Sequence, residues 1–441
     1  MKMRQKSLKH FLFLLVLTFL AVALLACKET GGSTTESSAA QTDASSQLSF
    51  RITWTDYSGR GQAIQKIVDS YNAISADDKD VVMIGGDENQ TTIEQMLASN
   101  PETVFVLPYR YVQYFGYRGE LMDLSDSFTE EKNLFYEKIW QLGTADGKVY
   151  GIPWLGHSMC LLYNKTLLET AGVDAGSITS LDTLVLALER VEQATDAQGI
   201  GLVGAESNDV SWMVNQFIYG FGGSLVDESG KSVIINSPQA ADALDFYKNV
   251  LGPHAQPTWV DDTGVEVMKC FLNQEIAFEI QGIWGITDVQ KNGEPFEVGV
   301  IPLSRIGLNA EVGPMMLALP AGISEQGKEQ AISFIRYMIS MDAQQAILNG
   351  EYSPEHDEYY PFRTPIRLDM ADTAMMRMHP DYQLFIVGFE HPSVDVPVPK
   401  WQAVKDDYYQ AGLHRVMTGE TTIEAFLRWI ETEGNRILAE P

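Results

Sequence analysis

The residues that could carry catalysis do not fall into a familiar catalytic pattern. The sequence has no Gly-x-Ser-x-Gly motif, no two of its seven histidines lie four positions apart, and no Cys/His spacing is typical of zinc. Acidic pairs such as Asp261-Asp262 and Asp406-Asp407 arise by chance in so acidic a chain, and a glycosidase needs two carboxylates that face each other across a cleft. We therefore predict a protein that is not an enzyme and uses no cofactor or metal. His157 is the one histidine that we place near a site.

The segment Gly-Arg-Gly-Gln-Ala-Ile, residues 59–64, has two glycines where a strand would turn into a helix. A dinucleotide site would need a third glycine, and a P-loop would need Gly-Lys-Ser/Thr, and both are missing. We interpret the segment as a tight turn, although the free backbone donors of a helix N-terminus can hold a polar ligand.

Aromatic residues are the more informative feature. Their faces stack on the apolar faces of sugar rings, while Asp, Asn, Arg and Glu bind the hydroxyl groups; packing in a core is the alternative role. The aromatic residues in predicted loops or at element ends are Trp54, Tyr57, Tyr109, Trp154, Trp212, Trp259, Trp284, Tyr359, Tyr360, Phe362 and Trp401.

The elements that must position these residues begin with an alternating strand at 48–54, followed by a helical repeat at Ile64, Ile67, Val68 and Tyr71. A second strand, a second helix and a third strand follow up to residue 108. This order predicts a parallel sheet covered by helices, in which ligands lie at the carboxyl ends of the strands. Asp56 and Tyr57 follow the first strand, and Tyr109 and Arg110 follow the third. We expect all four at the rim of a site.

Cys27 follows an apolar run, residues 11–26, that comes after Lys2, Arg4, Lys6 and Lys9. This pattern is typical of a cleaved secretory signal, with a membrane anchor as the alternative. The sequence Leu-Leu-Ala-Cys at its end resembles the lipobox of bacterial lipoproteins, in which the cysteine is acylated. We predict a signal peptide over 1–26, lipidation at Cys27, and a flexible Ser/Thr/Gly-rich tether over 27–47.

The composition argues against nucleic-acid binding. The chain has 31 Lys and Arg against 59 Asp and Glu, a net charge of −28, whereas nucleic acids and anionic membranes need a basic face. Cys160 and Cys270 lie among apolar residues, so we favour free buried thiols over a disulfide.

Several segments, in order, resemble a known family. They are residues 146–172 (DGKVYGIPW and LLYNKTLLETAG), 219–251 with Gly222-Gly223, 271–289 with a Gly-x-Trp, and 418–438. Together they resemble the bacterial extracellular solute-binding proteins of family 1, the sugar-binding receptors of ABC importers, of which maltose-binding protein is one.

The resemblance implies a periplasmic-binding-protein-like type II fold, with two α/β lobes, a hinge and a ligand cleft between the lobes. Lobe one would comprise residues 48–155 and 302–352, and lobe two residues 156–301 and 353–441. Trp284 and Trp212 would stack on sugar, and Asp56 and Tyr57 would bind hydroxyls. Where many relatives have an acidic residue, this chain has Tyr109 and Arg110, and an arginine can bind hydroxyls or pair with the carboxylate of an acidic sugar. Trp154 and Arg363 complete the set of expected ligand-binding residues.

The function that the resemblance implies is that of a monomeric, lipid-anchored receptor on the extracytoplasmic face of the membrane. It would deliver a sugar or oligosaccharide to the permease subunits of an ABC transporter. One alternative is an exported carbohydrate-active enzyme. Another is the same fold with a non-sugar solute: a polyol phosphate, a polyamine, or iron held by a tyrosine pair such as Tyr359-Tyr360 or Tyr408-Tyr409.

Overall fold

The computed structural model describes residues 47–55, 58–77, 79–86, 90–227, 229–389, 392–394, 396, 398 and 400–440, all within one compact unit, residues 45–441. The predicted signal peptide and nearly all of the predicted tether, with Cys27, lie outside the described residues, as do Asp56 and Tyr57. Among the helices that are described, none combines the length and the apolar character needed to cross a membrane.

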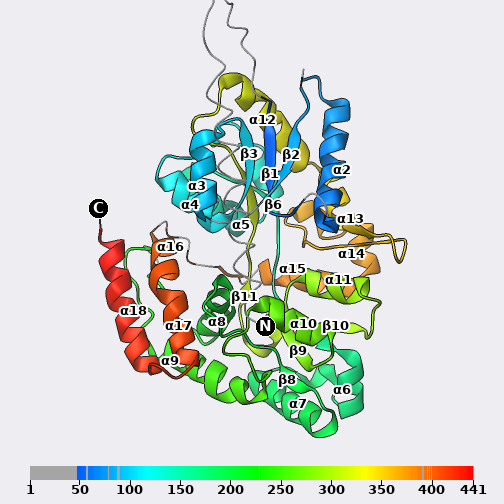
Figure 1. The fold of residues 1–441 in the computed structure, drawn as a ribbon, viewed down its shortest axis with the longest axis vertical. Helices are drawn as coiled ribbons and strands as arrows, with labels where there is room; N and C mark the ends of the chain where they lie inside the picture. Colours follow the sequence, from blue (N-terminus) through cyan, green and yellow to red (C-terminus); the bar gives the residue numbers. More distant parts are fainter. Residues whose placement is uncertain are drawn as a thin grey trace, which may run out of the picture. The chain divides into compact units, whose positions relative to one another are not determined.

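The first sheet has the order β2-β1-β3-β12-β6, and its parallel strands β1, β2 and β3 are labelled in Figure 1. Its strands are β1 (Ser49–Ile52), β2 (Val82–Gly85), β3 (Thr103–Pro108), β12 (Met315–Ala318) and β6 (Ile152–Leu155). The first three are parallel, which confirms the predicted strand–helix–strand start, while β12 runs antiparallel between β3 and β6. Its helices are α2 (Gly59–Ile74), α3 (Gln90–Ser99), α4 (Tyr109–Tyr117), α12 (Glu325–Met338) and α13 (Met341–Asn349).

The second sheet has the order β10-β7-β9-β8. Its strands are β7 (Cys160–Asn164), β8 (Gln198–Ile200), β9 (Ile276–Gln281) and β10 (Val298–Pro302). The main helices of this part are α6 (Lys165–Ala171), α7 (Leu181–Ala194), α8 (Asn208–Gly220), α9 (Pro238–Asp245), α10 (Gly264–Leu272), α11 (Ile283–Lys291), α17 (Gln410–Met417) and α18 (Ile423–Leu438).

Each sheet has its own buried hydrophobic core, and we call the two parts lobe one and lobe two. The cores divide the chain somewhat differently from the sequence-based division. Leu303, Ile306 and Leu308 pack into the core of lobe two, so the chain stays with that lobe after β10. Phe362 and Ile366 pack into the core of lobe one, beyond the predicted end of its second segment. Burial of these side chains moves both crossing points further along the chain.

Hydroxyl caps define where several helices begin. The Ser237 side chain accepts from the Ala240 N–H and precedes Pro238, the first residue of α9. Helix α12 ends at Met338 and α13 begins at Met341, because the Ser340 side chain accepts from the Ala343 N–H and caps a new helix. The cap of α18 is Thr422, whose hydroxyl accepts from the Ala425 N–H.

The cysteines of the described chain are both free thiols. Cys160 is buried on β7, and Cys270 on α10 is partly exposed. Burial raises the pKa of the Cys270 thiol to about 11. The interpretation of two unpaired thiols is confirmed, with Cys270 less buried than expected.

Candidate ligand-binding site

A cavity of about 350 Å³ lies between the two lobes, where strand ends and helix starts of both sheets meet. Lobe one contributes the end of β3 and the start of α4, and lobe two contributes the starts of α8, α10 and α11. Segments that connect the lobes add His157, Glu311 and Arg363. This is the place at which open α/β sheets bind ligands.

The cavity gathers most of the residues that the sequence singled out. The predicted binding residues that line it are Tyr109, Arg110, Trp212, Trp284 and Arg363. His157 lines it too, as expected. Tyr109 is only 2% exposed, so its ring forms part of the cavity wall and of the core of lobe one.

Trp284 lies at the start of α11, in the Gly-x-Trp segment, and is held between two neighbours. The His157 ring meets it edge-on, at 5.5 Å between ring centroids and an interplanar angle of 86°. The guanidinium carbon of Arg363 lies 4.9 Å from the centroid of Trp284 and 4.9 Å from that of Trp54. Cation–π attraction therefore positions Arg363 between an indole of lobe one and an indole of lobe two.

The two carboxylates of the cavity have partners within the protein. Glu311 Oε2 lies 2.7 Å from His157 Nε2, and Glu311 is 7% exposed. Asp209, in the first turn of α8, accepts from the Trp212 indole N–H at 3.2 Å and from the Gly264 backbone N–H at 3.0 Å. Asp209 thereby fixes the orientation of Trp212 and joins the starts of α8 and α10.

Trp154 occupies a different environment from the other predicted binding residues. It is 0% exposed in the core of lobe one, and its ring contacts Phe50 edge-on at 5.5 Å. Its carbonyl accepts from the Gln344 side chain at 3.0 Å. Trp154 does not line the cavity, so its role in the described structure is packing.

Four polar residues of the cavity were missed by sequence reasoning: Asn208, Asp209, Gln281 and Glu311. Asp209 carried a usable signal, because it lies one helical turn before Trp212. Gln281 and Glu311 gave no such signal in the sequence. Each lies in a short buried strand, and such a strand is typical of a hydrophobic core.

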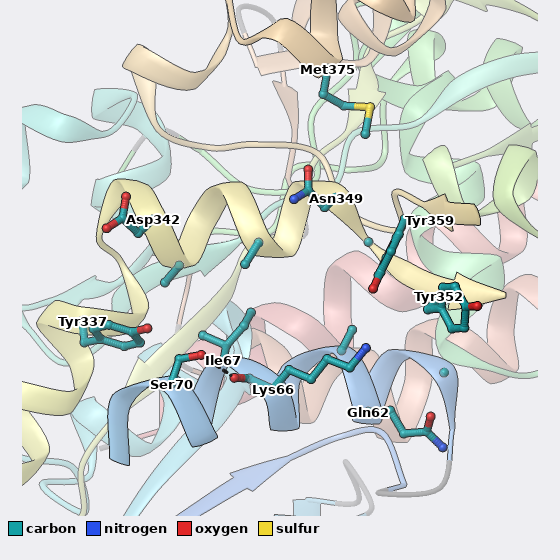
Figure 2. Close-up of a pocket in the computed structure, with 15 residues that line it drawn as sticks. Gln62, Lys66, Ile67, Ser70, Tyr337, Asp342, Asn349, Tyr352, Tyr359 and Met375 are labelled. Atoms are coloured by element: carbon teal, nitrogen blue, oxygen red, sulfur yellow. Dashed lines mark hydrogen bonds between the residues drawn. The ribbon is translucent and has the colours of Figure 1, made fainter. Parts of the chain in front are cut away.

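A larger cavity, of about 560 Å³, lies between α2 and α13 of lobe one (Figure 2). Lys66 extends from α2 toward Tyr352 and Tyr359, with its Nζ 5.7 and 5.6 Å from their ring centroids. The Tyr352 hydroxyl donates to Asp357 at 2.7 Å, which raises the pKa of Tyr352. None of the predicted binding residues that the structure describes lines this cavity, which is lined mainly by residues of α2 and α13 together with Met375, a side chain packed against the core of lobe two. We therefore assign the ligand site to the smaller cavity.

An ionic cluster joins the lobes at the start of α2. Arg60 of lobe one donates to Asp288 of α11 at 3.1 Å and lies 3.3 Å from Glu351, while Lys291 of α11 pairs with the same Glu351. Glu351, the first residue of β13 (Glu351–Ser353), is 1% exposed at its side chain. Burial raises the pKa of Asp288, and the Arg60 and Lys291 cations act in the opposite direction.

In the described part of the chain, no cluster of three or more His, Cys, Asp or Glu side chains could hold a metal ion. The site is a cavity between two lobes, lined by aromatic rings, guanidinium groups and partnered carboxylates. Such a site binds and orients a polar ligand that it encloses, which is the chemistry of a binding protein.

Comparison with known proteins agrees with this geometry. The model of the family described as bacterial extracellular solute-binding protein matches residues 55–345, and the chain belongs to this family. A probable ABC transporter-binding protein of Deinococcus radiodurans is 27% identical over 330 residues, which are 72% of this chain and 76% of that protein. The maltodextrin-binding protein MdxE of Bacillus subtilis is 24% identical over 225 residues, 49% of this chain and about half (51%) of the relative.

Among solved structures, a solute-binding protein of Thermotoga lettingae, bound with α-D-tagatose, has a TM-score of 0.76 at 19% identity. The alignment covers 90% of this chain and 100% of that chain. This likeness confirms the predicted type II fold with two α/β lobes. The family and these relatives are binding proteins, not enzymes.

Proposed function

We propose that this protein is the lipid-anchored substrate-binding component of an ABC transporter, that it binds a sugar or oligosaccharide in the cavity between its lobes, and that it delivers the sugar to the permease. The observation that carries the proposal is the cavity itself, where Trp212 and Trp284 present indole rings beside Arg110 and Arg363. Indole faces suit the apolar faces of sugar rings, and guanidinium donors suit hydroxyl oxygens. The maltodextrin-binding and tagatose-bound relatives support a saccharide as the ligand.

Uptake requires that ligand binding changes the protein in a way that the permease can recognise. A sugar that contacts Arg110 of lobe one and Trp284 of lobe two at once binds the closed arrangement more tightly than the open one. It shifts the population toward closure by that difference in affinity. The outer surfaces of both lobes then present a geometry that only the loaded protein adopts.

The membrane attachment in the proposal rests on the sequence around Cys27. The basic start, the apolar run and the Leu-Leu-Ala-Cys motif support a cleaved signal and an acylated cysteine. Acyl chains on that cysteine, followed by the Ser/Thr/Gly-rich segment, would hold the binding unit at the extracytoplasmic face of the membrane. This placement brings the receptor beside its permease.

Among the alternatives, an iron site receives no support from the described residues. Neither Tyr359-Tyr360 nor Tyr408-Tyr409 lines the cavity between the lobes. Tyr409 is 0% exposed and donates its hydroxyl hydrogen to Asn215 at 2.8 Å, which accounts for it as a core residue of lobe two.

A thermal-shift screen of residues 45–441 against mono- and oligosaccharides tests the proposal. A saccharide present at about a hundred times its dissociation constant stabilises the native state by about 2.7 kcal/mol, provided that it binds that state alone. We expect at least one saccharide to raise the melting temperature and to be recovered unchanged. If the recovered sugar is cleaved, the protein is an enzyme, and if no saccharide shifts the melting temperature, the sugar assignment is refuted.

A further inference from the structure

Two of the segments that connect the lobes pair with each other as a short antiparallel ribbon beside the cavity. One leads from β6 to β7, and the other leads from β11 (Ala310–Glu311) to β12. Ser158 and Val312 form an antiparallel bridge between them, and the Gly313 N–H donates to the His157 carbonyl at 3.3 Å. This pairing ties the two connections together where the chain passes between the lobes.

One face of this ribbon forms part of the cavity wall. Side chains alternate between the two faces of paired strands, so the residues that flank Ser158 and Val312 share the opposite face. The four residues of that face all line the cavity: His157, Met159, Glu311 and Gly313. Glu311 lies diagonally across the ribbon from His157, and the distance from Glu311 Oε2 to His157 Nε2 is 2.7 Å. A His–Glu pair therefore joins one connection to the other at the cavity.

Gly313 provides the space that the His157 ring occupies. It lies opposite His157 in the ribbon, and a Cβ atom at this position would overlap His157 Cε1 and lie 2.6 Å from Nε2. Unbonded heavy atoms pack at about 3.5–4.0 Å, so any larger residue at position 313 would displace the ring. The ring lies across the ribbon, within reach of Glu311, because residue 313 has no side chain.

The same imidazole ring contacts Trp284 of lobe two. The two rings meet at 5.5 Å between centroids and at 86°, an edge-to-face geometry that the charge distribution of aromatic rings favours. The indole also lies against the backbone of Gly282, where a Cβ atom would overlap its six-membered ring. Trp284 is only partly buried, so these contacts restrict an indole that would otherwise have space to turn. His157 is therefore in contact with both the ribbon and the aromatic wall of the cavity.

We infer that His157 is a positioning residue for Trp284, which holds the indole in one orientation in the cavity and links that orientation to the paired connections between the lobes. Glu311 and Gly313 act through His157, the first by holding the imidazole nitrogen and the second by leaving room for the ring. The consequence for saccharide affinity rests on the proposed function, whereas the orientation of Trp284 does not. Movement of the ribbon when the lobes move then changes the surface that Trp284 presents to a ligand.

The environment of Trp284 can be measured without any ligand, by fluorine NMR of residues 45–441 labelled with 5-fluorotryptophan. The chain has eight tryptophans, and the Trp284 resonance is identified by its absence in Trp284→Phe. We expect His157→Gln, which keeps a hydrogen-bond donor for Glu311 but has no ring, to shift or broaden this resonance. Gly313→Ala displaces the ring from the other strand of the ribbon and should produce the same change.

Two further substitutions serve as controls for the spectrum. His254 also pairs with a glutamate, Glu192, at 3.0 Å, but it does not line the cavity, so His254→Gln should leave the Trp284 resonance unchanged. Glu311→Gln keeps an oxygen that accepts from His157 and should retain most of the natural resonance, whereas Glu311→Ala should not. Melting curves without ligand establish that each variant is folded.

Titration calorimetry with maltotriose, or with another saccharide that the thermal-shift screen detects, measures the consequence for binding. We expect His157→Gln to weaken binding by about three- to tenfold, the value of one edge-to-face ring pair. In the Trp284→Phe background the same substitution should have little further effect, because both changes remove one shared interaction. Equal weakening in both backgrounds would show that His157 acts on the saccharide directly and would contradict the inference.

The outcomes separate this inference from the proposed function. An unchanged Trp284 resonance in folded His157→Gln and Gly313→Ala refutes the inference, whatever the saccharides do. A similar shift of every tryptophan resonance also refutes it, because that result indicates a general loss of packing. If no saccharide binds, the proposed function fails, and the fluorine spectra still decide whether His157 positions Trp284.

Discussion

Glu351→Gln is the substitution whose effect on stability can be worked most directly from the structure. The Glu351 carboxylate is 1% exposed and lies between Arg60 of lobe one, at 3.3 Å, and Lys291 of lobe two. Glutamine keeps the shape of the side chain and removes the charge. Two cations then lose a common buried partner.

The expected loss follows from the burial of the three groups. Breaking a fully buried ion pair by removing one partner costs about 3–5 kcal/mol. Here the side chains of Arg60 and Lys291 are 21% and 33% exposed, and Arg60 retains Asp288 at 3.1 Å, so water and the second carboxylate reduce the penalty. We therefore expect the free energy of unfolding to fall by about 2 kcal/mol.

Urea unfolding of residues 45–441, followed by tryptophan fluorescence and circular dichroism, measures this change. Glu433→Gln is the matched control, because Glu433 forms an exposed pair with Arg436 three positions along α18. An exposed pair of this kind contributes about 0–1 kcal/mol. If Glu351→Gln costs no more than Glu433→Gln, the cluster does not stabilise the contact between the lobes and the reasoning is refuted.

Two further predictions separate binding residues from core residues and test a buried carboxyl group. Trp284→Ala and Trp212→Ala should each weaken saccharide binding by about 1–3 kcal/mol in calorimetry without unfolding the protein. Trp154→Ala should instead lower the free energy of unfolding by about 3–5 kcal/mol, because that ring is fully buried, and unfolding of all three variants alike would contradict this division. Glu279 is 1% exposed, and burial, with a smaller contribution from Asp288, raises its pKa well above the usual value. Folding therefore favours the protonated form, so this group's contribution to stability is complete below the unfolded pKa, about 4.3, and is lost as the pH rises through the folded pKa. Glu279→Gln should thus gain stability relative to the natural protein as the pH increases in urea titrations, and a constant difference would show that the carboxyl group does not titrate as described.

Much of the architecture was predictable because local sequence patterns determine where its strands and helices form. The alternation at 48–54 and the helical repeat after Gly59 predict β1 and α2, and hydroxyl residues mark the helix starts, as Ser237 does. The order of β12 in the first sheet was not predictable from local patterns. Met315–Ala318 is an apolar run like many others, and its place between β3 and β6 depends on pairing over long distances in the chain.

The candidate site was predictable where a residue follows a strand or begins a helix. Tyr109 and Arg110 follow β3, and Trp284 begins α11, so topology alone brings them together. Trp154 shows the limit of this reasoning, since an aromatic residue near a crossing is equally compatible with the core. Glu311 and Gln281 were unpredictable because their role depends on side-chain partners, His157 and Gly282, rather than on any pattern in the sequence.

Calorimetric titration of residues 45–441 with a saccharide found by the screen, beside the same titration of Trp284→Ala, tests the central claim most directly. Our account predicts that one saccharide binds per protein, that it is recovered unchanged, and that the affinity falls by about ten- to a hundredfold in the folded variant. Unaltered affinity in Trp284→Ala would show that the ligand binds outside the cavity between the lobes and would contradict the account.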